Sequence, residues 1–275
     1  MSNNYKIFYV NGCSHTIGCD IEKDNSVRSP YDLENCWAGQ IHNNYLSNAK
    51  YINSGQGGSD NFTISYNTIE HVNQLLASGI SPSEILVIIG WSGPDRRSFI
   101  SDWKPSKAIF RKFPDFPYHV QFSSQFSEMK NSTIPYYKEL YNGLTRHSSM
   151  LEDMTNFLYV YNSTVNFLQS KKIPYFMFHS ISVSWDEVLT KQGLRISAIG
   201  LKLDTNLLND NRKKIKDMIF YKNYENDNFM LKNISMYAYL RKNKFSFSPT
   251  HHFRKDGHAE WANILSTKLK DLALI

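Results

Sequence analysis

Two short segments at opposite ends of the chain carry side chains that could together cleave an ester bond. The first, residues 12–18 (GCSHTIG), places Ser14 in a small, turn-forming run directly after an apolar stretch. The second, residues 252–262 (HFRKDGHAEWA), supplies histidines. A serine hydroxyl becomes a nucleophile when an imidazole accepts its proton. We therefore predict a hydrolase whose serine and histidine come from opposite termini.

The elements that would position these side chains follow from the hydrophobic pattern. Apolar runs predict strands at residues 6–11, 51–53, 85–89 and 174–178. Helical spacing predicts helices over residues 36–46, 60–76, 136–169 and 256–272. Asp60 is the expected N-cap of the second of these helices. The polar residues 20–34 are expected to form a loop.

The alternation of strands and helices predicts a parallel sheet with helices on both sides. Binding sites in such sheets lie beyond the carboxyl ends of the strands, where the Ser14 segment is expected. Residues 94–134 are aromatic and aperiodic, which suggests a long loop or lid. Residues 184–245 show no clear pattern. We therefore expect a single domain over residues 1–275 with insertions at about 94–134 and 184–245.

Composition limits the class of protein. A chain of 275 residues suits one large α/β domain. Three cysteines, Cys13, Cys19 and Cys36, form no Cys-x-x-Cys pair, so we expect neither a disulfide framework nor a zinc ribbon. There is no apolar run of about 18 residues and no signal-peptide pattern, so we expect synthesis in the cytoplasm and no membrane partner.

The positive charge is concentrated in the last part of the chain. The net charge is +6, and the residues after position 200 hold 14 Lys and Arg against 8 Asp and Glu, which is the whole excess. Such a surface is either a solvated face or an attraction for an acidic polymer such as an anionic glycan. No nucleic-acid-binding motif accompanies the charge, so nucleic acid is not the expected partner.

Four segments resemble, in order, the signature of the SGNH (GDSL-type) serine hydrolases. They are residues 12–14 (GCS), 53–59 (NSGQGGS), 90–96 (GWSGPDR) and 249–262 (PTHHFRKDGHAEWA). The resemblance implies a flavodoxin-like three-layer α/β/α fold with a central parallel sheet and a lid built from insertions. It also implies that Ser14 is the nucleophile and His252 the general base. The implied oxyanion donors are the N–H groups of Ser14 and Gly58, with Gly57 as a neighbour able to replace Gly58, and the side chain of Ser92.

Three positions depart from the family pattern. Cys13 stands at the usual aspartate of the first segment, and Ser92 replaces an asparagine with a shorter donor. Arg96 could compensate by bringing positive charge near the pocket, or it could be an ordinary surface arginine. Pro249 and Thr250 occupy the place of the triad aspartate.

Several groups could take the place of that aspartate. A backbone carbonyl, Thr250 or a carboxylate from elsewhere could orient the His252 imidazole; otherwise the site works as a Ser–His dyad. Asp256 is a poor substitute because it is expected to begin a helix.

The other histidines and the aromatic residues leave further alternatives. His15 is either a second imidazole of the site or a loop residue, and His258 is expected to pack at a helix N-terminus. Neighbouring histidines such as His251 and His252 point to opposite faces of an extended segment, so we expect no metal and no other cofactor. The aromatic stretch 110–126 could line a sugar-binding face or pack the lid on the core.

The leading hypothesis is an esterase acting on a small acyl ester, with O-acetylated, acidic glycans as candidate substrates. Acyl transfer would use the same residues. A hypothesis from another class is a binding or structural module with weakened catalysis. The chain resembles divergent phage members of the superfamily in this respect, and such a module could be associated with the virion.

Overall fold

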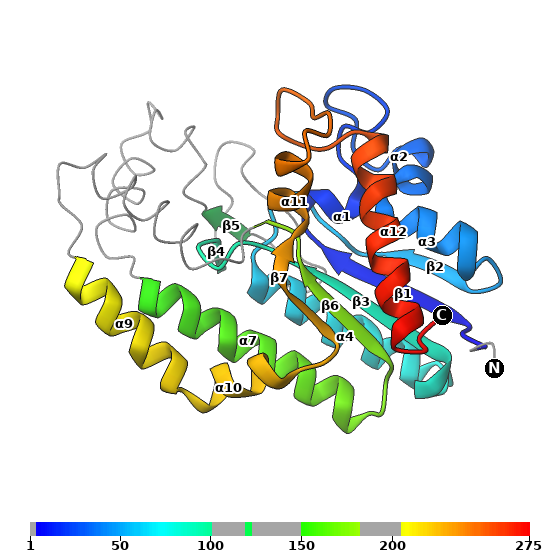
Figure 1. Cartoon of the computed structure of the whole chain (residues 1–275). Coiled ribbons are helices and arrows are strands. Elements are labelled where there is room, and N and C mark those ends of the chain that lie inside the picture. Colours follow the sequence, from blue (N-terminus) through cyan, green and yellow to red (C-terminus); the bar gives the residue numbers. More distant parts are fainter. Residues whose placement is uncertain (1–3, 101–118, 123–149, 182–204) are drawn as a thin grey trace.

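The computed structural model describes residues 4–100, 119–122, 150–181 and 205–275. In this part of the chain, five parallel strands form one sheet in the order β2-β1-β3-β6-β7 (Figure 1). Their bounds are Ile7–Gly12 (β1), Lys50–Asn53 (β2), Ile85–Trp91 (β3), Tyr175–His179 (β6) and Met230–Ser235 (β7). This is the flavodoxin-like strand order, and it places the switch point between β1 and β3.

Helices cover both faces of the sheet, so the fold has three layers (Figure 1). Alternate side chains of each strand enter different cores. Tyr9, Val87 and Met177 face a core shared with α4, α7, α9 and α10. Val10, Ile88 and Phe178 face the opposite core, shared with α3, α11 and α12. The predicted parallel α/β/α architecture is therefore confirmed.

Of the predicted helices, α3, α4 and α12 begin and end within about one residue of their predicted positions, and α7 ends within one; α1, α2, α9, α10 and α11 were not predicted. The helix bounds are Ser14–Ile17 (α1), Pro30–Asn35 (α2), Trp37–Tyr45 (α3), Asn61–Ala77 (α4), Met150–Ser170 (α7), Thr205–Asp217 (α9), Ile219–Asn226 (α10), Met236–Lys242 (α11) and Lys255–Asp271 (α12); Pro82–Glu84 is a short 3₁₀ turn. Asp60 is the N-cap of α4, because its side chain accepts the Thr63 N–H at 2.8 Å. Residues 136–149 of the expected third helix lie outside the described residues.

The prediction of a loop over residues 20–34 was wrong at its C-terminal end, because α2 begins at Pro30. Ser29 and Asp32 form a reciprocal capping box there, and Pro30 occupies the first turn. The carboxylate of Asp32, at the third helical position, completes this box. Hydrophobic spacing, on which the loop prediction was based, does not reveal such a cap. The helix anchors the polar segment that precedes it.

Parts of the two expected insertions are regular structure. Arg97–Ile100 (β4) and His119–Phe122 (β5) pair antiparallel, so these two described parts of the expected lid are strands. The residues between and after them, 101–118 and 123–149, lie outside the described residues, as do the side chains of 110–126.

The second expected insertion, 184–245, must be corrected at its C-terminal side. Residues 230–235 form the edge strand β7, and Met236 and Leu240 of α11 enter the core. Lys232 and Asn233 interrupt the apolar run that would have revealed this strand. The division into one domain with two insertions otherwise stays a prediction.

Among the described helices, none combines the length and the apolar character needed to cross a lipid bilayer.

Candidate active site

Ser14 stands at the carboxyl end of β1, at the switch point of the sheet. The strand ends at Gly12, Cys13 is the N-cap residue of α1, and Ser14 is the first residue of that helix. Within the described residues, the Ser14 hydroxyl has no hydrogen-bond partner, yet it is not among the fully enclosed polar atoms. The side chain therefore sits in a largely buried position, with the residue 6% exposed, and keeps a free hydroxyl.

Gly58 lies in the loop after β2, and this loop is bonded to the carboxyl end of β1, where Ser14 also lies. The Gln56 N–H donates to the Gly12 carbonyl at 3.0 Å, so this loop meets the end of β1. Gly58 has a φ of +77°, a left-handed conformation that glycine adopts without strain. Neither Gly58 nor Ser14 uses its backbone N–H in a hydrogen bond to another described residue. Both N–H groups are thus free for an acceptor from outside the chain.

Ser92 follows β3, and Asn61 fixes its backbone. Asn61 Oδ1 accepts the Ser92 N–H at 2.8 Å, and Asn61 Nδ2 donates to the carbonyls of Ser92 and Gly93 at 3.2 and 3.4 Å. The Ser92 hydroxyl is fully buried and has no partner among the described residues. Ser92 therefore lies at the expected edge, but its side chain is enclosed. Asn61 was not anticipated, because its role depends on a contact between the start of α4 and the end of β3.

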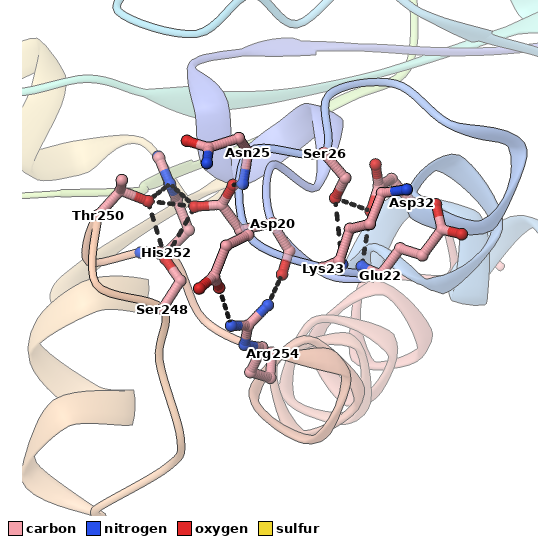
Figure 2. A network of polar contacts seen from close by, with 11 residues as sticks. Asp20, Glu22, Lys23, Asn25, Ser26, Asp32, Ser248, Thr250, His252 and Arg254 are labelled. Carbon is pink, nitrogen blue, oxygen red and sulfur yellow. Dashed lines mark hydrogen bonds and ion pairs between the residues drawn. The ribbon is translucent and has the colours of Figure 1, made fainter.

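His252 and Asp20 form an imidazole–carboxylate pair (Figure 2). His252 Nδ1 lies 2.9 Å from Asp20 Oδ2, and the Asp20 side chain is only 4% exposed. An ionised carboxylate only accepts hydrogen bonds, so Nδ1 carries the proton and Nε2 keeps its lone pair. Nε2 has no partner among the described residues and is not enclosed. This arrangement fixes the imidazole through a buried carboxylate and leaves Nε2 able to accept a proton.

Hydroxyl groups of the segment before His252 complete the surroundings of Asp20 (Figure 2). Ser248 Oγ donates to Asp20 Oδ2 at 2.8 Å, and Thr250 Oγ1 donates to the same oxygen. Thr250 Oγ1 also lies 3.1 Å from His252 Nδ1. Burial by itself raises the pKa of Asp20, but the hydrogen bonds from Thr250, His252 and Ser248 outweigh it and hold the pKa below its ordinary value. Asp20 is therefore a stable anion.

The backbone around Asp20 is fixed by a second buried carboxylate, Asp32. Asp32 Oδ1 accepts the Glu22 N–H at 2.9 Å and the Ser26 hydroxyl at 3.0 Å, while Oδ2 accepts the Ser29 N–H at 3.2 Å. Asp20 itself has a φ of +64° and accepts the Asn25 N–H on Oδ1 at 2.8 Å. These bonds hold the polar loop in one shape and direct Asp20 toward His252 (Figure 2).

Burial lowers the pKa of His252 below its ordinary value. The hydrogen bond and the charge of Asp20 raise the pKa, whereas Arg96 and His251 lower it further. Burial prevails, so the imidazole is neutral near pH 7 and can accept a proton.

His15 lies against His252 and not in a solvent-exposed loop. Its ring centroid is 5.3 Å from that of His252 in an edge-on contact, and its ring also contacts Tyr237 and Phe253. Burial, with His252, His258 and Arg96, lowers the pKa of His15 well below its ordinary value. Because His15 follows Ser14 directly, the ring contact brings the Ser14 turn beside His252. No hydrogen bond joins Ser14 and His252 within the described residues; such bonds often tighten only when substrate binds.

His258 packs at a helix N-terminus, which confirms the expectation. Its Nδ1 accepts the N–H of Trp37, the first residue of α3, at 3.2 Å, and the side chain is fully buried. Burial lowers the pKa of His258 to about 3. In the described residues, no group of three or more His, Cys, Asp or Glu side chains is arranged to hold a metal ion.

Arg96 ends the turn after β3, where its N–H donates to the Gly93 carbonyl at 3.1 Å. Its Nη1 reaches the Ser59 carbonyl at 3.4 Å, next to Gly58. Its charge lowers the pKa of both His15 and His252. Arg96 therefore belongs to the same edge of the sheet as the other candidate residues.

Asp20 was missed by sequence analysis, although a carboxylate from elsewhere was one of the alternatives. It lies 232 positions before His252, outside all four segments of the family resemblance. Its distance of six residues from Ser14 was the only available signal, and nothing in the pattern distinguished it from Asp24. The structure thus brings together residues of the first and last segments with one that no motif marks.

A family model described as "Family of unknown function (DUF6071)" matches residues 17–207. The chain belongs to this family. The DUF6071 match includes Asp20, Gly58 and Ser92 but begins after Ser14 and ends before His252. No curated protein sequence matches this DUF6071 chain.

Solved structures similar to this DUF6071 protein include the crystal structure of YxiM from Bacillus subtilis, with 11% identity and a TM-score of 0.45. That match covers 98% of this chain and 57% of YxiM, so the chain spans little more than half of that structure. Another is a carbohydrate esterase whose active site is described as having divergent catalytic and non-catalytic binding functions. It has 11% identity and a TM-score of 0.41, covering 97% of this chain and 69% of the esterase.

Proposed function

We propose that this protein is a serine ester hydrolase of the SGNH type. The proposal is carried by one observation: the buried carboxylate of Asp20 binds Nδ1 of His252, and that imidazole lies beside the turn that carries Ser14. A carboxylate on one ring nitrogen leaves the other nitrogen free to accept the serine proton. Asp20 supplies the group that is missing from the usual position before His252.

The acylation step uses three groups. Ser14 Oγ attacks the carbonyl carbon of the ester as its proton passes to Nε2 of His252. The carbonyl oxygen becomes an anion, for which the free N–H groups of Ser14 and Gly58 are donors. The intermediate then expels the alcohol, which takes the proton from Nε2 and leaves the acyl group on Ser14.

Deacylation repeats the sequence with water as the nucleophile. His252 accepts a proton from water, the hydroxide attacks the acyl carbon, and the carboxylic acid leaves as Ser14 recovers its proton. Thr250 supports this cycle through its bond to Asp20, and His15 supports it by packing against His252. The enclosed Ser92 hydroxyl would reach the oxyanion only after a local rearrangement.

The substrate class follows from the proposed chemistry and from charge. An acyl-enzyme on Ser14 suits a small acyl ester, and an O-acetylated glycan is a natural member of that class. The basic last third of the chain favours an acidic glycan, because opposite charge raises the local concentration of substrate. An acyl acceptor other than water would turn the same cycle into acyl transfer.

Two observations favour a second candidate, a binding or structural module with weakened catalysis, for example in a virion. The Ser92 hydroxyl is enclosed, and no hydrogen bond joins Ser14 to His252 within the described residues. In this case the edge of the sheet would hold a glycan without cleaving it.

Hydrolysis of 4-nitrophenyl acetate by wild type, Ser14→Ala and Ser54→Ala tests the proposal. Ser54 is the matched control, since it lies at the same edge but its hydroxyl bonds His71 Nδ1 at 3.2 Å. We expect Ser14→Ala to lose the activity, and a fluorophosphonate probe to label wild type but not this variant. An unchanged rate in Ser14→Ala refutes the proposed nucleophile. Absence of both turnover and labelling, together with glycan binding, supports the binding module.

A further inference from the structure

Arg96 places a positive charge at the edge of the sheet that carries Ser14. Its backbone belongs to the turn after β3, and its side chain reaches across to the loop after β2. The acceptor there is the carbonyl of Ser59, directly after the proposed oxyanion donor Gly58. The guanidinium therefore bridges the two loops that flank the end of β1.

No carboxylate neutralises this arginine within the described residues. Asp60 and Asp95 are near in sequence, but neither forms an ion pair with Arg96. Asp60 accepts the Thr63 N–H at 2.8 Å, and Asp95 is buried. Asp20, the anion of the site, is bound by His252 and two hydroxyl groups.

Most donors of the Arg96 guanidinium have no acceptor among the described residues. A guanidinium offers five N–H donors in a planar fork, and the only protein acceptor of this side chain in the described residues is one carbonyl at 3.4 Å. The side chain is half-buried, so water only partly screens its charge. A free, partly desolvated fork of this kind matches the two oxygens of a carboxylate or phosphate.

We propose that Arg96 binds an anionic group of the substrate, so that the site prefers esters carrying a carboxylate over neutral esters. The inference rests on the proposed hydrolase and names its substrate class. The transient oxyanion already has donors in the N–H groups of Ser14 and Gly58. A permanent carboxylate elsewhere on the substrate accepts hydrogen bonds from the unbonded N–H groups of Arg96. This interaction contributes to substrate binding rather than to the chemical step.

Two pairs of esters test the preference and locate the carboxylate. For the acyl side, 4-nitrophenyl hemisuccinate is compared with 4-nitrophenyl acetate; for the alcohol side, O-acetylated glucuronate is compared with O-acetylated glucose. Wild type should show a KM about tenfold lower for the anionic member of at least one pair, the usual value of one charge-assisted hydrogen bond. The pair that shows the difference identifies which side of the ester carries the charge.

Three variants assign the preference to Arg96. Arg96→Gln should lose the KM difference, and Arg96→Lys should keep part of it because the charge remains. Arg28→Gln is the matched control, since Arg28 donates to the Asn53 carbonyl at the same edge of the sheet. It removes the same charge and should leave the KM difference intact.

Several outcomes overturn the inference while the hydrolase stands. These are equal KM values in both pairs, a preference that survives Arg96→Gln, and an equal loss in Arg28→Gln. A fall in kcat for neutral and anionic esters alike in Arg96→Gln, with KM unchanged, would instead place the guanidinium at the oxyanion.

If wild type hydrolyses none of the four esters, the proposed function fails, and binding still tests Arg96. Calorimetric titration of succinate and glucuronate should then show binding by wild type that Arg96→Gln loses. Absence of binding in wild type, or equal binding by both proteins, overturns the inference.

Discussion

Replacing Asp20 by asparagine tests the central pair of the site. Asparagine has nearly the same shape and tolerates the left-handed backbone of this position, where φ is +64°. Its carbonyl can still accept the Asn25 N–H, so the loop should keep its fold. The amide carries no charge, and its NH₂ group can donate to Nδ1 of His252. That donation favours the tautomer with a proton on Nε2, which cannot act as a base.

The expected loss follows from the geometry of the pair. Coulomb's law with an effective dielectric constant of about 20 gives about 6 kcal/mol for unit charges at the 2.9 Å between Asp20 Oδ2 and His252 Nδ1. The His252 side chain is 21% exposed, so solvent screens part of this attraction. If screening halves the Coulomb energy, ~3 kcal/mol remains to stabilise the imidazolium. Loss of this energy lowers kcat/KM by a factor of about 10². The wrong tautomer increases the loss toward about 10⁴.

The assay is hydrolysis of 4-nitrophenyl acetate at pH 7.5 by wild type, Asp20→Asn and Asp24→Asn. Asp24 is the matched control, because it lies in the same loop but is exposed and pairs with Arg254. Asp24→Asn should stay within about threefold of wild type, as expected for a surface ion pair. If Asp20→Asn also retains activity within threefold while Ser14→Ala is inactive, Asp20 does not orient the base and the reasoning fails.

The remaining predictions concern pH. Because burial lowers the pKa of His252 and the base must be neutral, kcat/KM should rise with pH through an inflection below 6.5 and then level off; an inflection above 6.5 in a pH–rate profile contradicts this. Asp20→Asn removes the influence that raises this pKa, so its inflection should move to lower pH. Burial also lowers the pKa of His179 and His258 to about 3, so the unfolded chain binds more protons than the folded one between pH 3 and 6.5. The free energy of unfolding should therefore decrease as the pH is lowered from 6.5, by about 2 kcal/mol per histidine at pH 5. Denaturant titrations at several pH values should show a smaller decrease for His179→Gln and for His258→Gln than for wild type.

Much of the fold could be predicted because local pattern and burial agree in its centre. β3 and β6 are covered on both faces, so every residue of each strand is buried and the sequence shows a continuous apolar run. Asp60 could be identified as a cap because its side chain acts on the next turn of its own helix. β7 could not be predicted, because an edge strand tolerates polar residues such as Lys232.

The sequence by itself determined the alternation of β1, β2, α4, β3, β6 and α12, the position of Ser14 at the end of the first strand, and the choice of a histidine near the C-terminus. Each of these depends on neighbours along the chain or on a short motif. Only the tertiary structure decided that Asp20 binds His252 and that the Ser92 hydroxyl is enclosed. Those contacts join residues far apart in sequence and depend on how loops fixed by Asp32 and Asn61 meet at one edge of the sheet, which no periodicity of the chain encodes.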